Sequence, residues 1–146
     1  MRALLDVSVL VALLDAGHLH HRAASAWLAS HRRGGWASCP LTQNGCLRVL
    51  SLPGYPNPQP TARVAHRLAG AVADRSHAFW PDDFSLLDAD RLRWDRVLGP
   101  RQLTDLYLLA LAVRRGGTFV MLDQAVDPAA VPGASARHLT VIGTTP

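Results

Sequence analysis

The sequence predicts an α/β fold, a three-layer α/β/α sandwich with a mainly parallel central sheet. Short apolar runs alternate with segments of helical periodicity along the chain, and no internal repeat or low-complexity tract interrupts this alternation. The size agrees, because 146 residues, of which 49% are hydrophobic and 18% charged, suit one packed core and are untypical of a disordered chain. We therefore expect a single domain over residues 1–146.

Short apolar runs predict the strands, and two of these runs end at an aspartate. The run 3–5 stops at Asp6, and the continuous run 118–122, typical of a buried strand, stops at Asp123. Further strands are expected over 36–39, 78–80 and 138–142.

Helical periodicity, with start and stop signals, predicts the connecting segments. The clearest helix has Thr104 as its expected N-cap, Asp105 in its first turn and a Gly-Gly pair at 116–117 beyond its end. The segment 52–60 holds four prolines, which predicts a loop. Other helices are expected over 7–14, 20–30, 41–50 and 61–75, the last capped by Thr61, while 85–98 is expected to be helical or a mixture of short turns.

The charged residues are of only two kinds. Arginine supplies all 15 basic residues and aspartate all 11 acidic ones, and the net charge of +4 is compatible with a polyanionic partner. Two cysteines are too few for a disulfide scaffold. Asp6 and Asp15 bracket an apolar stretch too short for a membrane helix and unlike a secretory signal. We expect a cytoplasmic protein without a membrane segment.

Three aspartates occupy positions that a parallel sheet places at its ligand-binding edge. Asp6 and Asp123 follow strands and Asp105 opens a helix, and the carboxyl ends of parallel strands share one edge with the starts of the following helices. Converging carboxylates repel one another unless a cation neutralises them, and oxygen ligands without His or Cys select Mg²⁺ or Mn²⁺. The pattern predicts a metal site at which water attacks a phosphate ester. The plainer interpretation makes Asp6 and Asp105 helix caps and Asp123 the start of a turn; the other aspartates, Asp82 among them, are expected to be solvated.

Four segments resemble a PIN-domain ribonuclease of the VapC toxin type, and the resemblance covers essentially the whole chain. They are residues 4–8 (LLDVS), 41–45 (LTQNG), 102–112 (QLTDLYLLALA) and 121–123 (MLD). The resemblance implies an α/β/α sandwich, a Mg²⁺- or Mn²⁺-dependent endoribonuclease acting on structured cellular RNA, a homodimer, and a VapB-type antitoxin that blocks the site. Position by position, the family's acidic residues fall on Asp6, Asp105 and Asp123.

One position departs from the family's pattern. Gln43 stands where the family usually has a Glu, and the chain contains no Glu that could take over. A carboxamide is no base, but its oxygen accepts a hydrogen bond from water. We hypothesise that Asp6 and Asp105 bind the metal, that Asp123 binds it or a second ion, and that Gln43 orients water. Loss of one supporting ligand typically costs ~10- to 100-fold, which predicts a slower enzyme that still works.

Other classes of protein remain as alternatives. The first is a catalytically attenuated PIN-fold protein that only binds RNA or antitoxin because Gln43 has replaced the Glu. A dehalogenase-like phosphoesterase needs a second Asp where Ser8 stands. A dinucleotide-binding domain needs glycines after the first strand, and residues 6–8 have none.

RNA binding requires cations outside the acidic pocket. We expect five arginines to lie near its rim and to bind phosphates, which would make the affinity depend on salt; they are Arg22, Arg48 and Arg101, together with Arg32 and Arg33. The plainer interpretation is that they are solvated surface charges. The four tryptophans are expected mainly in the core or a dimer interface, with stacking on unpaired bases as the alternative.

Overall fold

A computed structural model describes residues 1–122 and 124–143 of the chain. The described strands form one parallel sheet in the order β3-β2-β1-β4-β5. Their bounds are β1 (Ala3–Leu5), β2 (Trp36–Ser38), β3 (His77–Phe79), β4 (Thr118–Leu122) and β5 (Leu139–Ile142). The predicted strands are confirmed to within one residue at each end, and the sheet is parallel throughout the described part of the chain.

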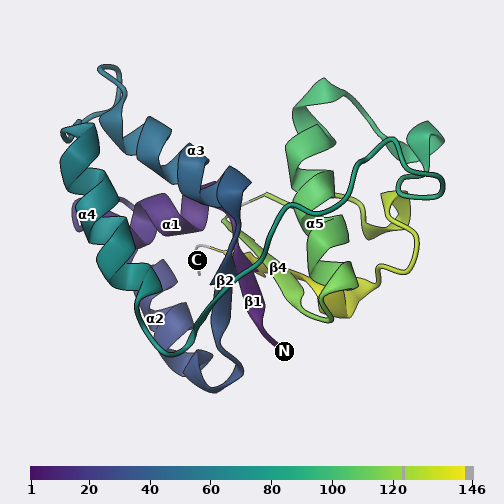
Figure 1. The fold of residues 1–146 in the computed structure, drawn as a ribbon, viewed down its shortest axis with the longest axis horizontal. Helices are drawn as coiled ribbons and strands as arrows, with labels where there is room; N and C mark the ends of the chain where they lie inside the picture. Colours follow the sequence, from purple (N-terminus) through teal and green to yellow (C-terminus); the bar gives the residue numbers. More distant parts are fainter. Residues whose placement is uncertain (123, 144–146) are drawn as a thin grey trace.

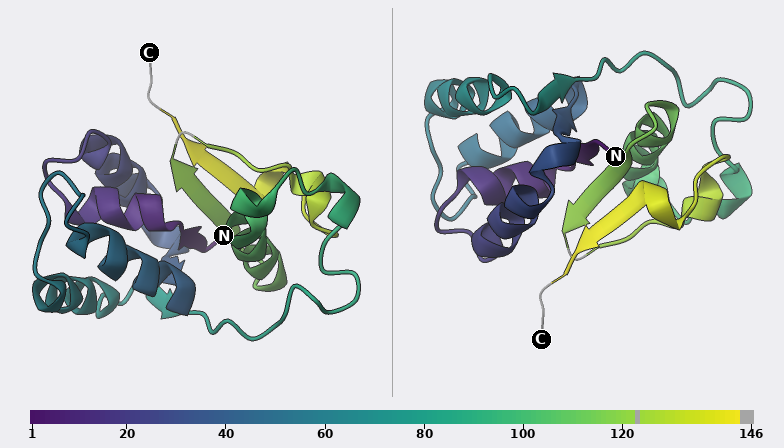
Figure 2. Two further views of the ribbon diagram at one scale, coloured as in Figure 1. Left: turned by 90° about the horizontal axis from the view of Figure 1, so that it is seen from above. Right: turned by 90° about the horizontal axis from the view of Figure 1, so that it is seen from below.

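Helices cover both faces of this sheet (Figures 1 and 2). They are α1 (Val7–Leu14), α2 (His21–Ser30), α3 (Pro40–Ser51), α4 (Thr61–Val72) and α5 (Leu103–Arg114). Short 3-10 turns add η1 (Arg32–Gly34), η2 (Trp94–Arg96), η3 (Pro100–Gln102), η4 (Pro128–Ala130) and η5 (Ala136–His138). Helices α1 to α4 gather on one side and α5 lies on the other, which is the expected α/β/α sandwich.

Alternation along the strands divides the core into two clusters. On β1, Leu4 packs with the cluster built around α5, whereas Ala3 and Leu5 pack with the cluster that contains α1 to α4. On β4, Phe119 joins the first cluster and Val120 the second. Successive strand residues point to opposite faces, so a three-residue strand buried on both sides serves both layers.

Two predicted caps are wrong. Helix α5 begins at Leu103 with Gln102 as its N-cap, not at Thr104, because the 3-10 turn η3 runs straight into it. Helix α4 includes Thr61 as its first residue, because the Pro60 carbonyl already accepts the Val64 N–H, and it ends before residue 75. Such boundaries depend on backbone hydrogen bonds that composition does not reveal.

The segment 85–98 is the mixture of turns and not a helix. The Asp88 carboxylate accepts the backbone N–H of Ser85 over 3.1 Å, which closes a local turn. Asp90 has a φ of 62°, in the left-handed region that a regular helix excludes. Within residues 1–122 and 124–143, no helix combines the length and apolar character needed to cross a membrane.

Candidate active site

Asp6 directly follows β1 and stands at the start of α1. Its backbone N–H donates to the Val120 carbonyl of β4, and its carbonyl accepts the N–H groups of Val9 and Leu10, each over 3.0 Å. Its Oδ2 accepts the Ser8 hydroxyl over 2.8 Å. Burial raises the pKa of Asp6, against the lowering effect of the hydrogen bond from Ser8. Strand and helix thus fix a largely buried carboxylate at the edge of the sheet.

Asp105, in the first turn of α5, lies within electrostatic reach of Asp6. Burial raises the pKa of Asp105 to about 6, and the negative charge of Asp6 adds to the rise. The fold therefore brings together two of the three predicted carboxylates, which lie far apart in the sequence. The third, Asp123, lies outside the described residues.

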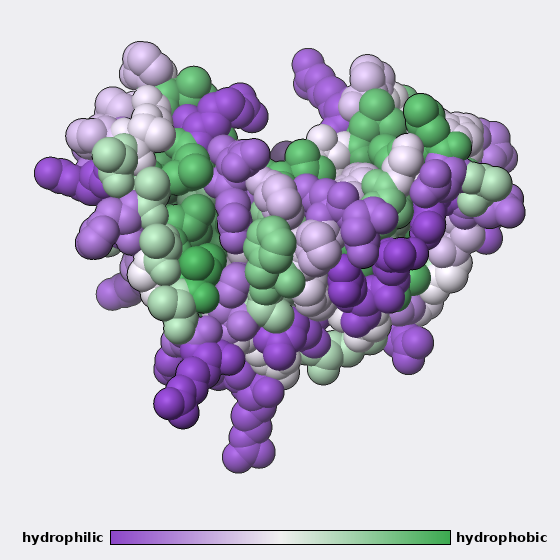
Figure 3. Space-filling model, viewed as in Figure 1, coloured by the Kyte–Doolittle hydropathy of each residue, from purple (hydrophilic) through white to green (hydrophobic). Residues whose placement is uncertain are grey.

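The elements that carry the carboxylates meet at one edge of the sheet. Asp6 directly follows β1, α3 begins two residues after the end of β2, and Asp105 lies in the first turn of α5. In the space-filling view the surface is notched between the regions over α3 and α5 (Figures 1 and 3). This edge holds the carboxyl ends of the strands, where ligands of parallel α/β sheets bind.

Gln43 lies in the second turn of α3, beside a chain of polar groups. Its Nε2 donates to the Ser38 hydroxyl over 3.0 Å, and Ser38 Oγ lies 2.8 Å from His77 Nε2. Ser38 is fully buried at the end of β2, and His77 begins β3. The Gln43 Oε1 atom has no hydrogen bond with a described residue and is open to a water or ligand.

Gly45, two residues after Gln43, lets α3 approach α1 closely. A Cβ atom at position 45 would lie 2.5 Å from Val7 Cγ2, a distance that real contacts do not show. Val7 is the residue after Asp6. The missing side chain therefore lets α3, which carries Gln43, pack against the residue that follows Asp6.

Asp82 was expected to be solvated, and that expectation is wrong. Its Oδ2 accepts the Leu41 N–H over 3.2 Å at the start of α3, and its Oδ1 is buried without a hydrogen-bond partner among the described residues. The negative charge of Asp82 contributes to the raised pKa of Cys39, after burial as the main cause. The sequence interpretation missed Ser38 and Asp82, which lie at this edge, and His77, which begins β3 and reaches Ser38 with its side chain. The Pro-Asp-Asp after a short strand was the only signal for Asp82.

The arginines proposed for RNA binding fall into two groups. Arg22 lies in the first turn of α2, Arg48 on the exposed side of α3 and Arg101 in η3, just before α5, and none of the three has an ion pair with a described residue. Arg32 and Arg33 lie in η1, where the chain enters β2. The prediction that these two lie near the acidic rim is wrong, because a chain entering a parallel strand is at the sheet's other edge.

The acidic pair fits a divalent cation. In the described part of the chain, no Arg or His forms an ion pair with Asp6 or Asp105, so the two charges have no counter-charge from the protein. No group of three or more His, Cys, Asp or Glu that could hold a metal occurs among residues 1–122 and 124–143. Two carboxylates suffice for Mg²⁺, which keeps several of its waters and takes further oxygen ligands from a substrate.

Comparison with known proteins decides the family. The model of the PIN domain matches residues 3–131. Ribonuclease VapC44 of Mycobacterium tuberculosis is 49% identical over 142 residues, which are 97% of this chain and 100% of the relative. The chain belongs to the PIN-domain family of VapC ribonucleases. Ribonuclease VapC39 of the same organism is 39% identical over 91% of this chain and 96% of its own, and Ribonuclease VapC38 is 41% identical over 85% and 86%.

The PIN-domain match confirms the family that the four motifs suggested. It spans every residue of the predicted catalytic set, which consists of Asp6, Gln43, Asp105 and Asp123. The departure at Gln43 therefore lies inside the matched domain and not in a segment added to it.

Proposed function

We propose that the chain is the toxin of a toxin–antitoxin pair and acts as a metal-dependent endoribonuclease that hydrolyses RNA phosphodiester bonds. The observation that carries the proposal is the juxtaposition of Asp6 and Asp105 at the carboxyl edge of the sheet without a protein counter-charge. The ribonuclease names of relatives that span nearly the whole chain support the same activity.

Asp6 and Asp105, with Asp123, would hold Mg²⁺ or Mn²⁺. When bound, such an ion neutralises the carboxylates and supplies Lewis acidity toward the phosphate and an activated water. Ser8 holds the Asp6 carboxylate in place through its 2.8 Å hydrogen bond. Gln43 orients the attacking water through its free Oε1. As water adds to phosphorus, the bond from phosphorus to the leaving ribose oxygen breaks, and Arg22, Arg48 and Arg101 bind neighbouring phosphates.

The ribonuclease names of the relatives favour the enzyme over the attenuated binding protein. The geometry at position 43 supports this, because an amide whose nitrogen is held by Ser38 keeps an acceptor oxygen in a fixed place. The proposal also includes a VapB-type antitoxin that blocks the site, a homodimer, and a cytoplasmic location, where RNA and antitoxin would be met.

RNA cleavage in the presence and absence of divalent metal tests the proposed function. Purified wild-type protein should cut structured RNA in Mg²⁺ or Mn²⁺, and EDTA should stop it. Asp6→Asn should be inactive, whereas Asp88→Asn, the same chemical change at an exposed carboxylate paired with Arg91, should retain activity. If wild type and Asp6→Asn were equally inert in both metals, the protein would be a binding protein and not a nuclease.

A further inference from the structure

A second hollow lies at the opposite edge of the sheet. It has a volume of about 360 Å³ and lies between the end of α2 and the beginnings of the strands. Its lining includes Trp27 and His31 from the end of α2, Arg33 from η1, Arg137 from η5, and Thr118 and Thr140 from β4 and β5. Figure 1 shows the end of α2 and the start of β1 on the side of the molecule away from the notch.

The hollow carries positive charge that no described residue neutralises. Arg33 and Arg137 are exposed and form no hydrogen bond or ion pair with a described residue. None of the described residues that line the hollow has a carboxylate. A concave surface with unpaired guanidinium groups favours a ligand that carries phosphate.

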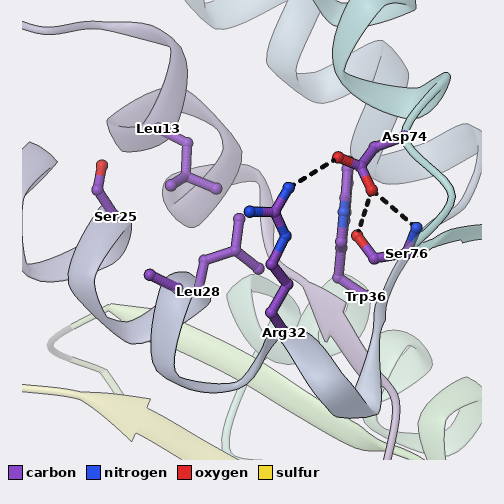
Figure 4. A pocket seen from close by; sticks show the side chains of 8 residues that line it. Leu13, Ser25, Leu28, Arg32, Trp36, Asp74 and Ser76 are labelled. Atoms are coloured by element: carbon purple, nitrogen blue, oxygen red, sulfur yellow. Dashed lines mark hydrogen bonds and ion pairs between the residues drawn. The ribbon is translucent and has the colours of Figure 1, made fainter.

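Arg32, the residue before Arg33, differs from it in having an acidic partner. Arg32 pairs with the Asp74 carboxylate over 3.3 Å, and Asp74 also accepts the Ser76 hydroxyl over 2.7 Å. Figure 4 shows this pair at a separate, mainly apolar pocket that Leu28 and Trp36 also line. Arg32 is thus engaged, whereas the adjacent Arg33 is not.

An aromatic pair lines the same hollow as the free arginines. The rings of Trp27 and His31 are stacked, with centroids 4.0 Å apart and an interplanar angle of 11°. The Thr118 and Thr140 hydroxyls, 3.0 Å apart, add polar groups to the lining. Cations beside a flat aromatic surface suit a nucleotide, which offers a phosphate and a base, better than an acidic peptide, which offers only charge.

We infer that this hollow is a second contact for the RNA substrate, with phosphates on Arg33 and Arg137 and a base against the stacked pair of Trp27 and the exposed His31. The inference rests on the proposed function, and it concerns a surface distinct from the acidic pair. Ala3 lines the hollow and Asp6 is three residues further along, about 10 Å at the rise of a strand, on the other edge of the sheet. The contact therefore serves RNA that passes from the acidic pair to the opposite edge of the sheet.

Salt-dependent binding of RNA tests the inference without cleavage. In the Asp6→Asn background, full-length protein is titrated with a fluorescent single-stranded RNA of about 30 nucleotides, longer than a typical binding site. Replacing both Arg33 and Arg137 with Ala should make the negative slope of log affinity against log salt shallower by about 1.4, at about 0.7 for each lost phosphate contact. Arg32→Ala, an adjacent arginine held in an ion pair, should leave the slope unchanged.

Two further ligands, inorganic polyphosphate and poly-aspartate, distinguish RNA from other polyanions as the ligand of the hollow. Inorganic polyphosphate should lose affinity on the double substitution but be insensitive to Trp27→Leu, whereas RNA should lose about tenfold on that change. An unchanged salt slope for RNA, or a larger effect of the arginines on poly-aspartate than on RNA, would overturn the inference. Absence of cleavage by the wild type would count against the proposed function alone, since binding is measured separately.

Discussion

Gln43 donates an N–H of its side-chain amide to the hydroxyl of Ser38, with 3.0 Å between Nε2 and Oγ. Because Ser38 accepts this hydrogen bond, its own proton is available to His77 Nε2, 2.8 Å away. Burial lowers the pKa of His77, against the raising effect of its hydrogen bond with the backbone of Val72, and so favours the neutral ring. In this row of hydrogen bonds each side chain donates toward His77. The side-chain oxygen of Gln43 is therefore left without a donor among the described residues.

Replacing Gln43 by Glu should raise the pKa of His77. A carboxylate only accepts, so Ser38 must donate to it, and His77 Nε2 must then carry a proton to satisfy Ser38. We expect an upward shift of about one pKa unit, measured from the ring signals of His77 in an NMR pH titration. In a Ser38→Ala background the shift should be much smaller; an equal shift there would mean that His77 senses the charge directly.

The same Gln43→Glu change should reduce the metal requirement. An added carboxylate supplies the ligand that the family usually has, so half-maximal RNA cleavage should need ~10- to 100-fold less Mg²⁺. Cleavage rates over a Mg²⁺ series measure this directly. An unchanged requirement would show that position 43 does not act on the metal.

The sequence predicted the elements that carry strong local signals. The five strands and the placement of Asp6 and Asp105 at one edge follow from apolar runs and from the way parallel strands are connected. Ser38 and His77 were not predicted, because their meeting depends on the pairing of β2 with β3, which no local pattern specifies. The prediction that Arg33 lies at the acidic rim was wrong for a similar reason. Successive loops of an α/β chain lie at opposite edges of the sheet, and the charge of a residue does not indicate the edge to which its loop belongs.

Asp105→Asn should stabilise the metal-free protein at neutral pH. The raised pKa of Asp105, about 6, means that the folded state holds this proton more tightly than the unfolded chain, with its ordinary value of 3.8. Stability is therefore full below 3.8, falls as pH rises through 6, and stays lower above it. Because Asp105 is only half-buried, we discount the shift to about 1 kcal/mol. Urea unfolding in EDTA at neutral pH measures the gain, which should vanish in strongly acidic buffer; Asp88→Asn is the control for loss of a surface charge.

Metal affinity should depend on pH through the same carboxylate. Below a pH of about 6 the ion must displace the proton of Asp105, so the Mn²⁺ dissociation constant should rise about tenfold for each further unit of acidity. Above that pH it should level off. Calorimetric titration with Mn²⁺, without RNA, follows this in wild type. A flat profile through the acid range would remove Asp105 from the metal ligands.

Gly45→Ala should impair both stability and cleavage. The new Cβ would lie 2.5 Å from Val7 Cγ2, so α3 must move away from α1 and shift the part of the helix that holds Gln43. Overpacking of this kind costs about 1–3 kcal/mol, measured as a lower free energy of unfolding in urea.

Two further variants separate the close helix contact from the general effect of adding a methyl group to a helix. Gly70→Ala, in α4, places its Cβ where no heavy atom lies within 4 Å, so it should stabilise the fold by about 0.5–1 kcal/mol. Val7→Ala removes the atoms that a methyl group at position 45 would meet. The stability lost through Gly45→Ala should therefore be much smaller in a Val7→Ala background than in the wild type. If the two substitutions were simply additive, α3 would not be held against α1 at this point, and the placement of Gln43 would need another cause.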